Sequence, residues 1–527
     1  MTDSRTAPGR TPPSWAASVA GLVGAGVALG VGELLSGFTS SVPSLVVAIG
    51  EVVVDKTPGD LTEAGIQAAG TNDKPALLAG IVLASLIIGA LLGRLAVRYP
   101  RGAAVGFLGF GVVGGWAAAR NPFASTFWSW FAALVAAVCG VFTMRVLLAL
   151  AALPPSATRH RVEPAGTFPT RRAFLTLSGG AAVAALASSG IGRALRRARS
   201  VESLREQITL PAAGAVVDGA AGATTPSGAL DTTVKGISPY LTPNDDFYRI
   251  DTALTVPQVD PKKWKLKIGG LVENPYTLTY DEILAMDLVD ETVTLACVSN
   301  EVGDKLVGNA TWRGVRLADL LGRAKVKPDG TQLVGISVDD FDAGFPTELA
   351  LDGRTALLAV GMNGQPLPVD HGFPARLVIA GIYGYVSAVK WIEEIRLTTN
   401  DYDGYWVPRG WAKLGPMKTQ SRIDVPRNRS RVVAGRSAIA GVAWAPTKGI
   451  AKVEIKVDTG EWRTCTLGGS TSDETWVQWY TEWDATRGDH VIEVRATDKT
   501  GYTQSPIPVD VRPDGAEGHH TIRVSVS

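Results

Sequence analysis

The stretch Met362-Asn-Gly-Gln-Pro-Leu-Pro-Val-Asp-His371-Gly-Phe-Pro-Ala-Arg376 joins a histidine and an arginine through proline-rich turns, and it continues into an apolar strand predicted over 375–380. A second cation, Lys390, follows a Gly-rich segment. Each of these polar side chains, taken singly, is also typical of an ordinary surface loop. Together His371, Arg376 and Lys390 supply hydrogen-bond donors that suit a phosphate group and a polar heterocycle.

Upstream, the run Glu291-Thr-Val-Thr-Leu-Ala-Cys297 predicts a strand that closes on a cysteine. A cysteine in that place is most often a core residue, and Cys139 and Cys465 keep that interpretation. Cys297 differs because a polar Ser-Asn-Glu loop at 299–301 begins where its strand ends. A thiolate there could act as a nucleophile or as a metal ligand.

Composition limits the chemistry that is open to this chain of 527 residues. Three Cys and five His exclude a disulfide framework, a zinc-finger array and a multi-haem protein. A net charge of +1 gives no basic field, so we expect no nucleic-acid partner. Any metal must therefore be held by one or two side chains together with a cofactor.

Two kinds of fold are predicted after residue 236. Up to about Lys418, strands mix with short helices in an α+β layout without regular strand–helix alternation; the strands are 264–268, 292–297 and 375–380, and the helices 280–286 and 316–321. No Gly-x-Gly-x-x-Gly opens a helix, which argues against a Rossmann site. After Gln420, alternating strands at 450–457, 490–496 and 521–526 predict a β-sandwich of immunoglobulin type.

Apolar blocks dominate residues 1–200, for which we predict an α-helical membrane anchor. Its five spans lie at 14–38, 75–97, 102–119, 123–153 and 173–191. The block 42–54 is too short to span easily and is open between a surface and a re-entrant segment, so the span number is five or six. Residues 201–235, rich in Ala, Gly and Pro, predict a flexible linker.

Arginine placement predicts the orientation of the anchor in the cell membrane. Arg5 and Arg10 put the amino terminus in the cytoplasm, so an odd number of spans makes residues after about 200 extracytoplasmic; the arginines at 193–199 oppose this assignment. The pair Arg171-Arg172, followed by Ala-Phe-Leu, resembles the twin-arginine export signature, which serves proteins exported already folded and often with a cofactor. An ordinary positive-inside flank is the alternative for this pair.

Several motifs resemble the sulfite oxidase family of molybdopterin enzymes: the His371 stretch with Val-Lys-Trp downstream, the Cys297 loop with Asn300, and Trp-Arg-Gly-Val-Arg-Leu at 312–317. Segments at 441–444, 450–455 and 460–462 are similar to that family's immunoglobulin-like dimerisation domain. The resemblance covers about 236–527. It implies a molybdopterin-binding catalytic domain at 236–418, a dimerisation domain at 419–527 that would form a homodimer, and a molybdenum–molybdopterin cofactor.

The resemblance also implies roles for single residues. Cys297 matches the thiolate that ligates molybdenum, Arg249 the active-site arginine and Tyr402 the active-site tyrosine, so these three are expected to be catalytic. The expected contacts to the pterin and its phosphate are Asn244, Tyr248, Arg249, Cys297, Ser337, His371, Arg376, Ala388, Val389 and Lys390.

The chain departs from the family where substrate would bind. Sulfite-oxidising members carry arginines directly after Cys-x-x-Asn, where this chain has Glu301 and Val302, and Asp251 replaces the family's histidine. A carboxylate there disfavours a dianion. The expected activity is oxygen-atom transfer on a small sulfur or other oxo compound, with an S-oxide reductase and a cofactor-free binding or sensor domain as alternatives.

The expected electron partner is external to the chain. Residues 1–158 contain no His, which excludes a bis-histidine haem within the anchor. A one-electron cytochrome or a quinone-linked membrane protein is therefore expected to exchange electrons with the catalytic domain.

Overall fold

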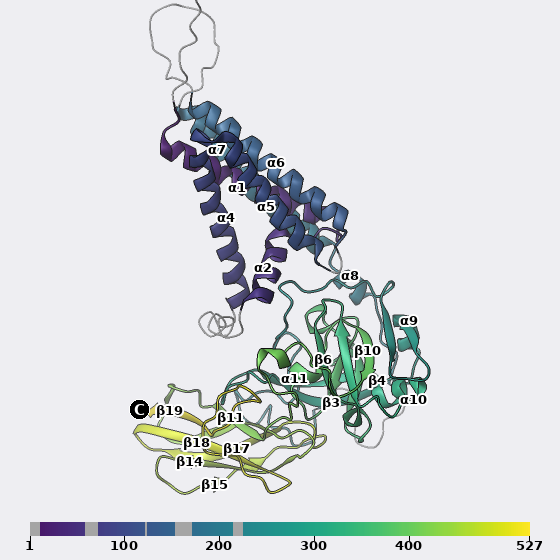
Figure 1. Ribbon diagram of the computed structural model, residues 1–527. Coiled ribbons are helices and arrows are strands. Elements are labelled where there is room, and N and C mark those ends of the chain that lie inside the picture. Colours follow the sequence, from purple (N-terminus) through teal and green to yellow (C-terminus); the bar gives the residue numbers. More distant parts are fainter. Residues whose placement is uncertain (1–10, 58–71, 122–123, 153–170, 214–224) are drawn as a thin grey trace, which may run out of the picture. The chain divides into compact units, whose positions relative to one another are not determined.

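The computed structural model describes residues 11–57, 72–121, 124–152, 171–213 and 225–527. Arg5, Arg10 and part of the predicted linker lie outside these ranges. The chain divides into two compact units, of which the first holds residues 1–200 with 253–255 and the second holds the remainder (Figure 1).

The first unit is built from helices (Figure 1): α1 (Ser14–Phe38), α2 (Leu45–Lys56), α4 (Asp73–Arg98), α5 (Pro100–Ala119), α6 (Thr126–Ala151) and α7 (Arg171–Ala198). Five helices among the described residues are long and apolar enough to cross a membrane, as the sequence predicts. The remaining block forms α2, whose 12 residues fall short of the roughly 20 that a spanning helix needs.

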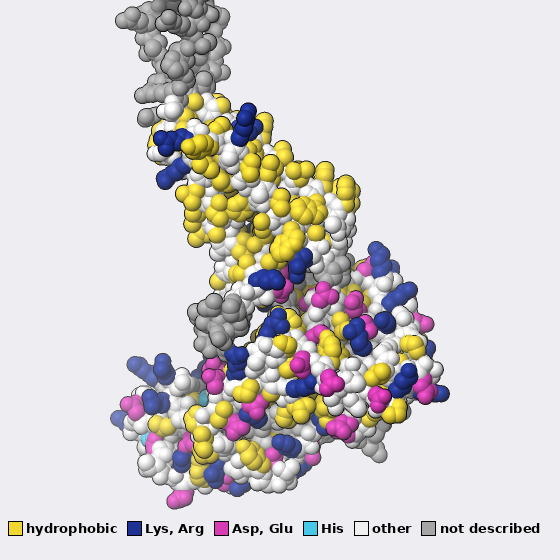
Figure 2. Space-filling view, in the orientation of Figure 1, with side chains coloured by type: hydrophobic (Ala, Val, Ile, Leu, Met, Phe, Trp, Pro, Cys, Tyr) yellow, Lys and Arg dark blue, Asp and Glu magenta, His cyan; other side chains and the backbone are white. Residues whose placement is uncertain are grey.

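Glycines let α1 pack closely against its neighbours. A Cβ atom at Gly21 would lie 2.1 Å from the carbonyl oxygen of Gly89 on α4, and one at Gly37 would lie 2.7 Å from the Cα of Gly192 on α7. Small residues of this kind allow helix backbones to approach in the absence of water. Figure 2 shows hydrophobic side chains over most of the visible face of this unit, which agrees with an apolar surrounding.

One buried carboxylate lies inside the helical unit. Glu33 of α1 pairs with Arg196 of α7 at 2.5 Å and accepts a hydrogen bond from Ser44, the residue before α2. A charge in such a place is costly unless it is paired. The ion pair therefore ties α7 to α1 and neutralises one of the arginines that oppose the predicted orientation.

Two sheets carry the α+β part of the second unit. One has the order β2-β1-β10-β5-β6, from β1 (Lys265–Gly270), β2 (Tyr276–Thr279), β5 (Gln332–Ser337), β6 (Asp342–Pro346) and β10 (Ile392–Thr398). The other has the order β3-β4-β7-β8 with β9 beside β7, from β3 (Val289–Ala296), β4 (Val307–Arg316), β7 (Ala356–Met362), β8 (Gln365–Pro366) and β9 (Arg376–Ile379). The short helices are α8 (Glu202–Glu206), α9 (Tyr280–Leu284), α10 (Leu317–Ala324) and α11 (Gly384–Ser387).

Two further sheets form the carboxyl-terminal sandwich (419–527). Their orders are β11-β13-β17-β16 and β12-β19-β18-β14-β15. The strands are β11 (Gln420–Val425), β12 (Arg431–Val432), β13 (Gly435–Trp444), β14 (Ile450–Val457), β15 (Arg463–Thr464), β16 (Thr466–Leu467), β17 (Val477–Ala485), β18 (Gly488–Asp498) and β19 (His520–Val526). Both sheets contribute to one core, in which Ile439 and Trp479 of the first sheet meet Val453 and Ile492 of the second.

The part of the predicted linker at residues 225–235 is packed rather than free. Leu230 and Val234 are buried against Ala440 of β13, and the backbone N–H of Leu230 donates to the side chain of Gln478 at 2.7 Å. The apolar Leu and Val positions within an otherwise small and polar segment explain this docking. The flexible character predicted for 201–235 therefore does not extend over residues 225–235.

Candidate active site

A cleft with a cavity volume of about 120 Å³ opens to solvent in the second unit. Seven of the residues that the sequence predicts for the site line it: Tyr248, Cys297, Ser337, His371, Arg376, Ala388 and Lys390. They come from the loop before β1, which holds Tyr248, from the ends of β3, β5 and β9, from the turn Val369–His371 and from the segment after α11. The predicted residues thus meet although 142 positions separate Tyr248 from Lys390 in the sequence.

Cys297 follows directly after β3 and is 8% exposed. Its N–H donates to Leu306 O at 2.9 Å, and the Asn300 side chain accepts from Leu306 N at 2.7 Å, so the loop closes on itself. Burial raises the pKa of the Cys297 thiol. A buried thiol in apolar surroundings is a poor free nucleophile, and it becomes a thiolate when a metal replaces its proton.

His371 and Arg376 form the polar floor of the cleft. Burial and the neighbouring Arg376 lower the pKa of His371 to about 4, so the imidazole is neutral at pH 7. Its Nε2 lies 3.0 Å from the carbonyl oxygen of Asn244, which can only accept; Nε2 therefore carries the proton. The other ring nitrogen, Nδ1, is then an acceptor.

Arg376 is a buried cation with no carboxylate partner among the described residues. Its side chain donates to the carbonyl oxygens of His371 and Leu377, and its guanidinium lies 4.8 Å from the ring centroid of Trp312. Burial lowers the pKa of Arg376 to about 10, which leaves it charged at neutral pH. A buried, uncompensated guanidinium that lines a cleft is suited to an anionic ligand such as a phosphate.

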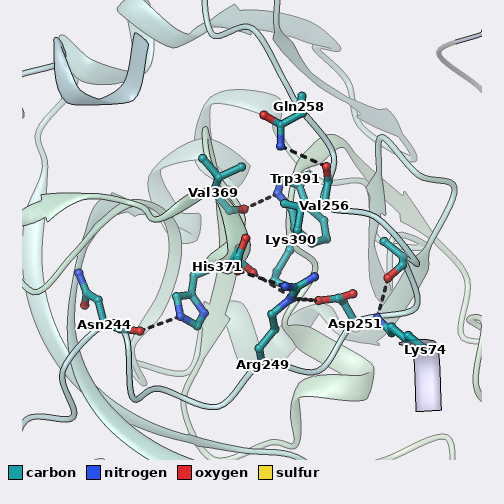
Figure 3. A network of polar contacts seen from close by, with 12 residues as sticks. Lys74, Asn244, Arg249, Asp251, Val256, Gln258, Val369, His371, Lys390 and Trp391 are labelled. Atoms are coloured by element: carbon teal, nitrogen blue, oxygen red, sulfur yellow. Dashed lines mark hydrogen bonds and ion pairs between the residues drawn. The ribbon is translucent and has the colours of Figure 1, made fainter. Parts of the chain in front are cut away.

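Lys390 and Arg249 share one buried carboxylate (Figure 3). Asp251, whose side chain is 4% exposed, lies 2.9 Å from Lys390 Nζ and 3.0 Å from Arg249 Nε. Arg249 also pairs with Asp370 at 3.1 Å. Burial lowers the pKa of Lys390 to about 8, although the negative charge of Asp251 favours the protonated form. Asp251, noted in the sequence only as a departure from the family, thus organises two of the predicted cations.

Four predicted residues do not line the cleft. Asn244 bonds Asn363 and supports His371 from behind through its carbonyl oxygen, whereas Val389 is fully buried. Arg249 lies in the ion-pair network beside the cleft. Tyr402, expected at the reacting centre, instead donates its hydroxyl to Asp342 and lines a separate, smaller pocket.

The cleft also has an aromatic side that was not predicted from the sequence. Phe341, Tyr385, Trp406 and Trp411 line it, and none of them is among the residues predicted for the site. The one available signal was the density of aromatic residues between Tyr402 and Trp411 in a segment without strand or helix periodicity.

The residues present fit a molybdenum–pterin cofactor. A single soft thiolate at Cys297 suits a metal whose other sulfur ligands come from the pterin, and the described residues hold no cluster of three His, Cys, Asp or Glu side chains that could bind a metal alone. Arg376 supplies the buried cation that a pterin phosphate requires. The class that this fold and cleft define is a cofactor-dependent oxidoreductase with one protein ligand to its metal.

Comparison with known proteins agrees with this class. The family model described as the oxidoreductase molybdopterin binding domain matches residues 253–406. The uncharacterized oxidoreductase YuiH of Bacillus subtilis is 33% identical over 159 residues, which are 30% of this chain and 76% of YuiH. Mitochondrial sulfite oxidase of Macaca fascicularis is 29% identical over 273 residues, 44% of this chain and 50% of that protein. The sulfane dehydrogenase SoxCD of Paracoccus pantotrophus aligns over 60% of this chain and 95% of its own, at 23% identity and a TM-score of 0.48.

The chain belongs to the family of oxidoreductases with a molybdopterin-binding domain, and it is similar to the sulfite oxidases. Its cofactor is accordingly molybdenum carried by molybdopterin. The chain spans about half the length of the animal sulfite oxidases that it matches.

Proposed function

We propose that the chain is a membrane-anchored oxidoreductase whose extracytoplasmic catalytic domain transfers an oxygen atom on a small sulfur or other oxo compound. One observation carries the proposal: the thiol of Cys297 and the uncompensated guanidinium of Arg376 face the same cleft. A metal ligand and a phosphate site are thereby combined in one cavity.

The chain's own residues divide the work of holding the cofactor. Cys297 ligates the metal, while Arg376, Lys390 and Ser337 bind the phosphate and pterin. The neutral His371 offers Nδ1 as an acceptor to a ring N–H. The molybdenum, when bound, would supply two-electron oxygen-atom chemistry, and the protein supplies its ligand and its phosphate site.

A second candidate, reduction of an S-oxide, is favoured by the charges around the cleft. Glu301 and Val302 follow the Cys297 loop, and neither lines the cleft. Lys390 is already paired with Asp251. A sulfite dianion therefore finds few free cations at the cleft, whereas a neutral S-oxide requires none.

The remaining parts have supporting roles in this proposal. The five apolar helices anchor the enzyme in the cell membrane, and the Arg pair at the start of α7 directs export by a twin-arginine route. The sandwich is of immunoglobulin type and forms a homodimer. A cytochrome or quinone-linked membrane protein exchanges single electrons with the site.

Metal and pterin analysis of the purified protein, joined to turnover assays with sulfite and methionine sulfoxide, tests the proposal. Cys297→Ser is expected to lose molybdenum and all turnover. Cys465→Ser is the matched control, because Cys465 is 6% exposed against 8% for Cys297 and lies in the sandwich core. Protein without molybdenum or pterin, or a Cys297→Ser variant with unchanged turnover, would refute it and favour a cofactor-free binding or sensor domain.

A further inference from the structure

The cleft has two chemically different sides. Its polar floor is formed by Cys297 with His371, Arg376 and Lys390. Its other side is the aromatic wall, which we define as Phe341, Tyr385, Trp406 and Trp411. Ile250, half exposed at 50%, lines the cleft as well. The cofactor roles proposed above use the floor and leave the wall unexplained.

The rings of the aromatic wall support one another. The ring centroids of Trp411 and Tyr385 are 5.8 Å apart, and those of Trp411 and Trp406 are 6.4 Å apart. Trp406 packs edge-to-face on Tyr405 at 5.1 Å. These spacings are those of favourable aromatic pairs. Both Trp side chains are only partly buried, so part of each ring remains open to the cleft.

The backbone behind the wall is fixed by polar contacts from two directions. Tyr385 donates its hydroxyl to the carbonyl oxygen of Ala412 at 2.6 Å. From the sandwich, Arg512 donates to Arg409 O at 2.6 Å, and the carbonyl of Pro513 accepts from Ala412 N at 3.0 Å. A surface held in this way is preorganised, so a ligand that stacks on it need not order the loop first.

The positively charged side chains near the wall are engaged in other contacts. Arg409 stacks on Tyr405 with 3.6 Å between guanidinium and ring centroid, and Lys413 pairs with Asp403 at 2.9 Å. Neither cation lines the cleft. The wall therefore offers stacking and apolar burial, and no countercharge, to whatever lies beside the reacting centre.

We infer that Trp406 and Trp411 are specificity-determining residues that select an S-oxide carrying a planar apolar substituent, with the S–O group toward Cys297 and the substituent against the wall. This inference rests on the proposed function. In the reductive direction the S–O bond breaks, sulfur gains two electrons delivered singly by the external donor, and two protons with the released oxygen form water.

Holoenzyme assays with a matched substrate pair test the inference. Methyl phenyl sulfoxide and dimethyl sulfoxide share the reacting group and differ in the planar substituent, and reduced methyl viologen supplies the electrons. Trp411→Ala is expected to lower kcat/KM for the phenyl substrate about tenfold and that for the methyl substrate less than about twofold, with Trp411→Phe restoring most of the loss. Leu414→Ala, 59% exposed and outside the cleft, is the control.

Calorimetric binding of the unreactive methyl phenyl sulfone separates this inference from the proposed function. We expect the wild-type chain to bind the sulfone about tenfold more tightly than Trp411→Ala does. Equal losses for both sulfoxides, sulfone binding that the substitution leaves unchanged, or a loss of molybdenum in Trp411→Ala would overturn the inference, the last by making the wall a cofactor contact. Wild-type protein without molybdenum would refute the proposed function, while the sulfone result still decides the role of the wall.

Discussion

Removal of the charge at Asp251 should destabilise the second unit, and the protonation of Lys390 should determine how this loss of stability depends on pH. Lys390 is 9% exposed at its side chain and has a pKa of about 8 with the carboxylate present. In Asp251→Asn the buried ammonium of Lys390 has no carboxylate beside it. The folded protein avoids the cost of this buried charge only if Lys390 releases its proton. That release costs about 1.36 kcal/mol per pH unit below the pKa, so the penalty through Lys390 reaches at most about 2.7 kcal/mol at pH 6 and about 1.4 kcal/mol at pH 7.

The assay is thermal unfolding of the cofactor-free protein followed by tryptophan fluorescence, because a pterin phosphate would give Lys390 a second anion. At pH 6 the midpoint should fall by about 5–11 °C, at about 2–4 °C per kcal/mol. At pH 9.5 the part of the difference that acts through Lys390 should vanish, since Lys390 is then neutral in both folded proteins, and only the loss of the Arg249 pair should remain.

Asp370→Asn is the matched control for this prediction. Asp370 is 51% exposed and pairs through its side chain with Arg249, itself 36% exposed, so its removal should cost less than about 1 kcal/mol at every pH. An Asp251→Asn penalty that is equal at pH 6 and pH 9.5, or no larger than that of Asp370→Asn, would refute the assignment of Asp251 as the counterion of a buried lysine.

Three further predictions concern other parts of the chain. Burial and Arg422 lower the pKa of His520 to about 4. The unfolded chain, with a pKa of about 6.5, therefore binds a proton first, and the wild type loses stability as the pH falls from about 6.5 toward 4. Between pH 7 and pH 5, denaturant titration should show about 2 kcal/mol less loss of unfolding free energy in His520→Gln than in wild type. Glu33→Gln leaves Arg196 unpaired and should lower the melting temperature in detergent, and a combined Arg196→Gln should recover part of it. Tyr402→Phe should keep its molybdenum and change turnover less than about threefold, because its hydroxyl binds Asp342 away from the cleft; a hundredfold loss would restore the role predicted from the sequence.

The sequence predicts best what depends on local pattern. Apolar runs long enough to span a membrane predict helices directly, and α1 has the predicted bounds of 14–38. The strand that ends at Ala296, directly before Cys297, is likewise predicted from its β-branched run and the polar loop after it. Motifs at His371 and Arg376 identify floor residues because a phosphate and a pterin demand the same donors wherever they are bound.

Contacts made over long separations could not be predicted in this way. Tyr402 leaves the cleft because Asp342, 60 residues away, accepts its hydroxyl. The aromatic wall depends on Arg512, which lies 103 residues beyond its acceptor Arg409. In the sequence, Asp251 is only a departure from the family's histidine, and the structure shows that it pairs with Lys390, 139 residues away. Tertiary pairing of this kind leaves no periodic signal in the chain.

The sandwich takes part in building the cleft, in addition to any role between subunits. The backbone N–H of Thr294, three residues before Cys297, donates to Glu474 O at 3.0 Å, and Arg422 donates to Asp304 O at 2.8 Å in the loop that follows Cys297. Arg512 fixes the wall from the same side. Both the Cys297 loop and the aromatic wall are therefore positioned by residues after 419. Because these contacts join backbone to backbone or to a charged side chain, the catalytic geometry depends on the sandwich being folded, and a division of the second unit at 419 would remove supports from the floor and the wall together.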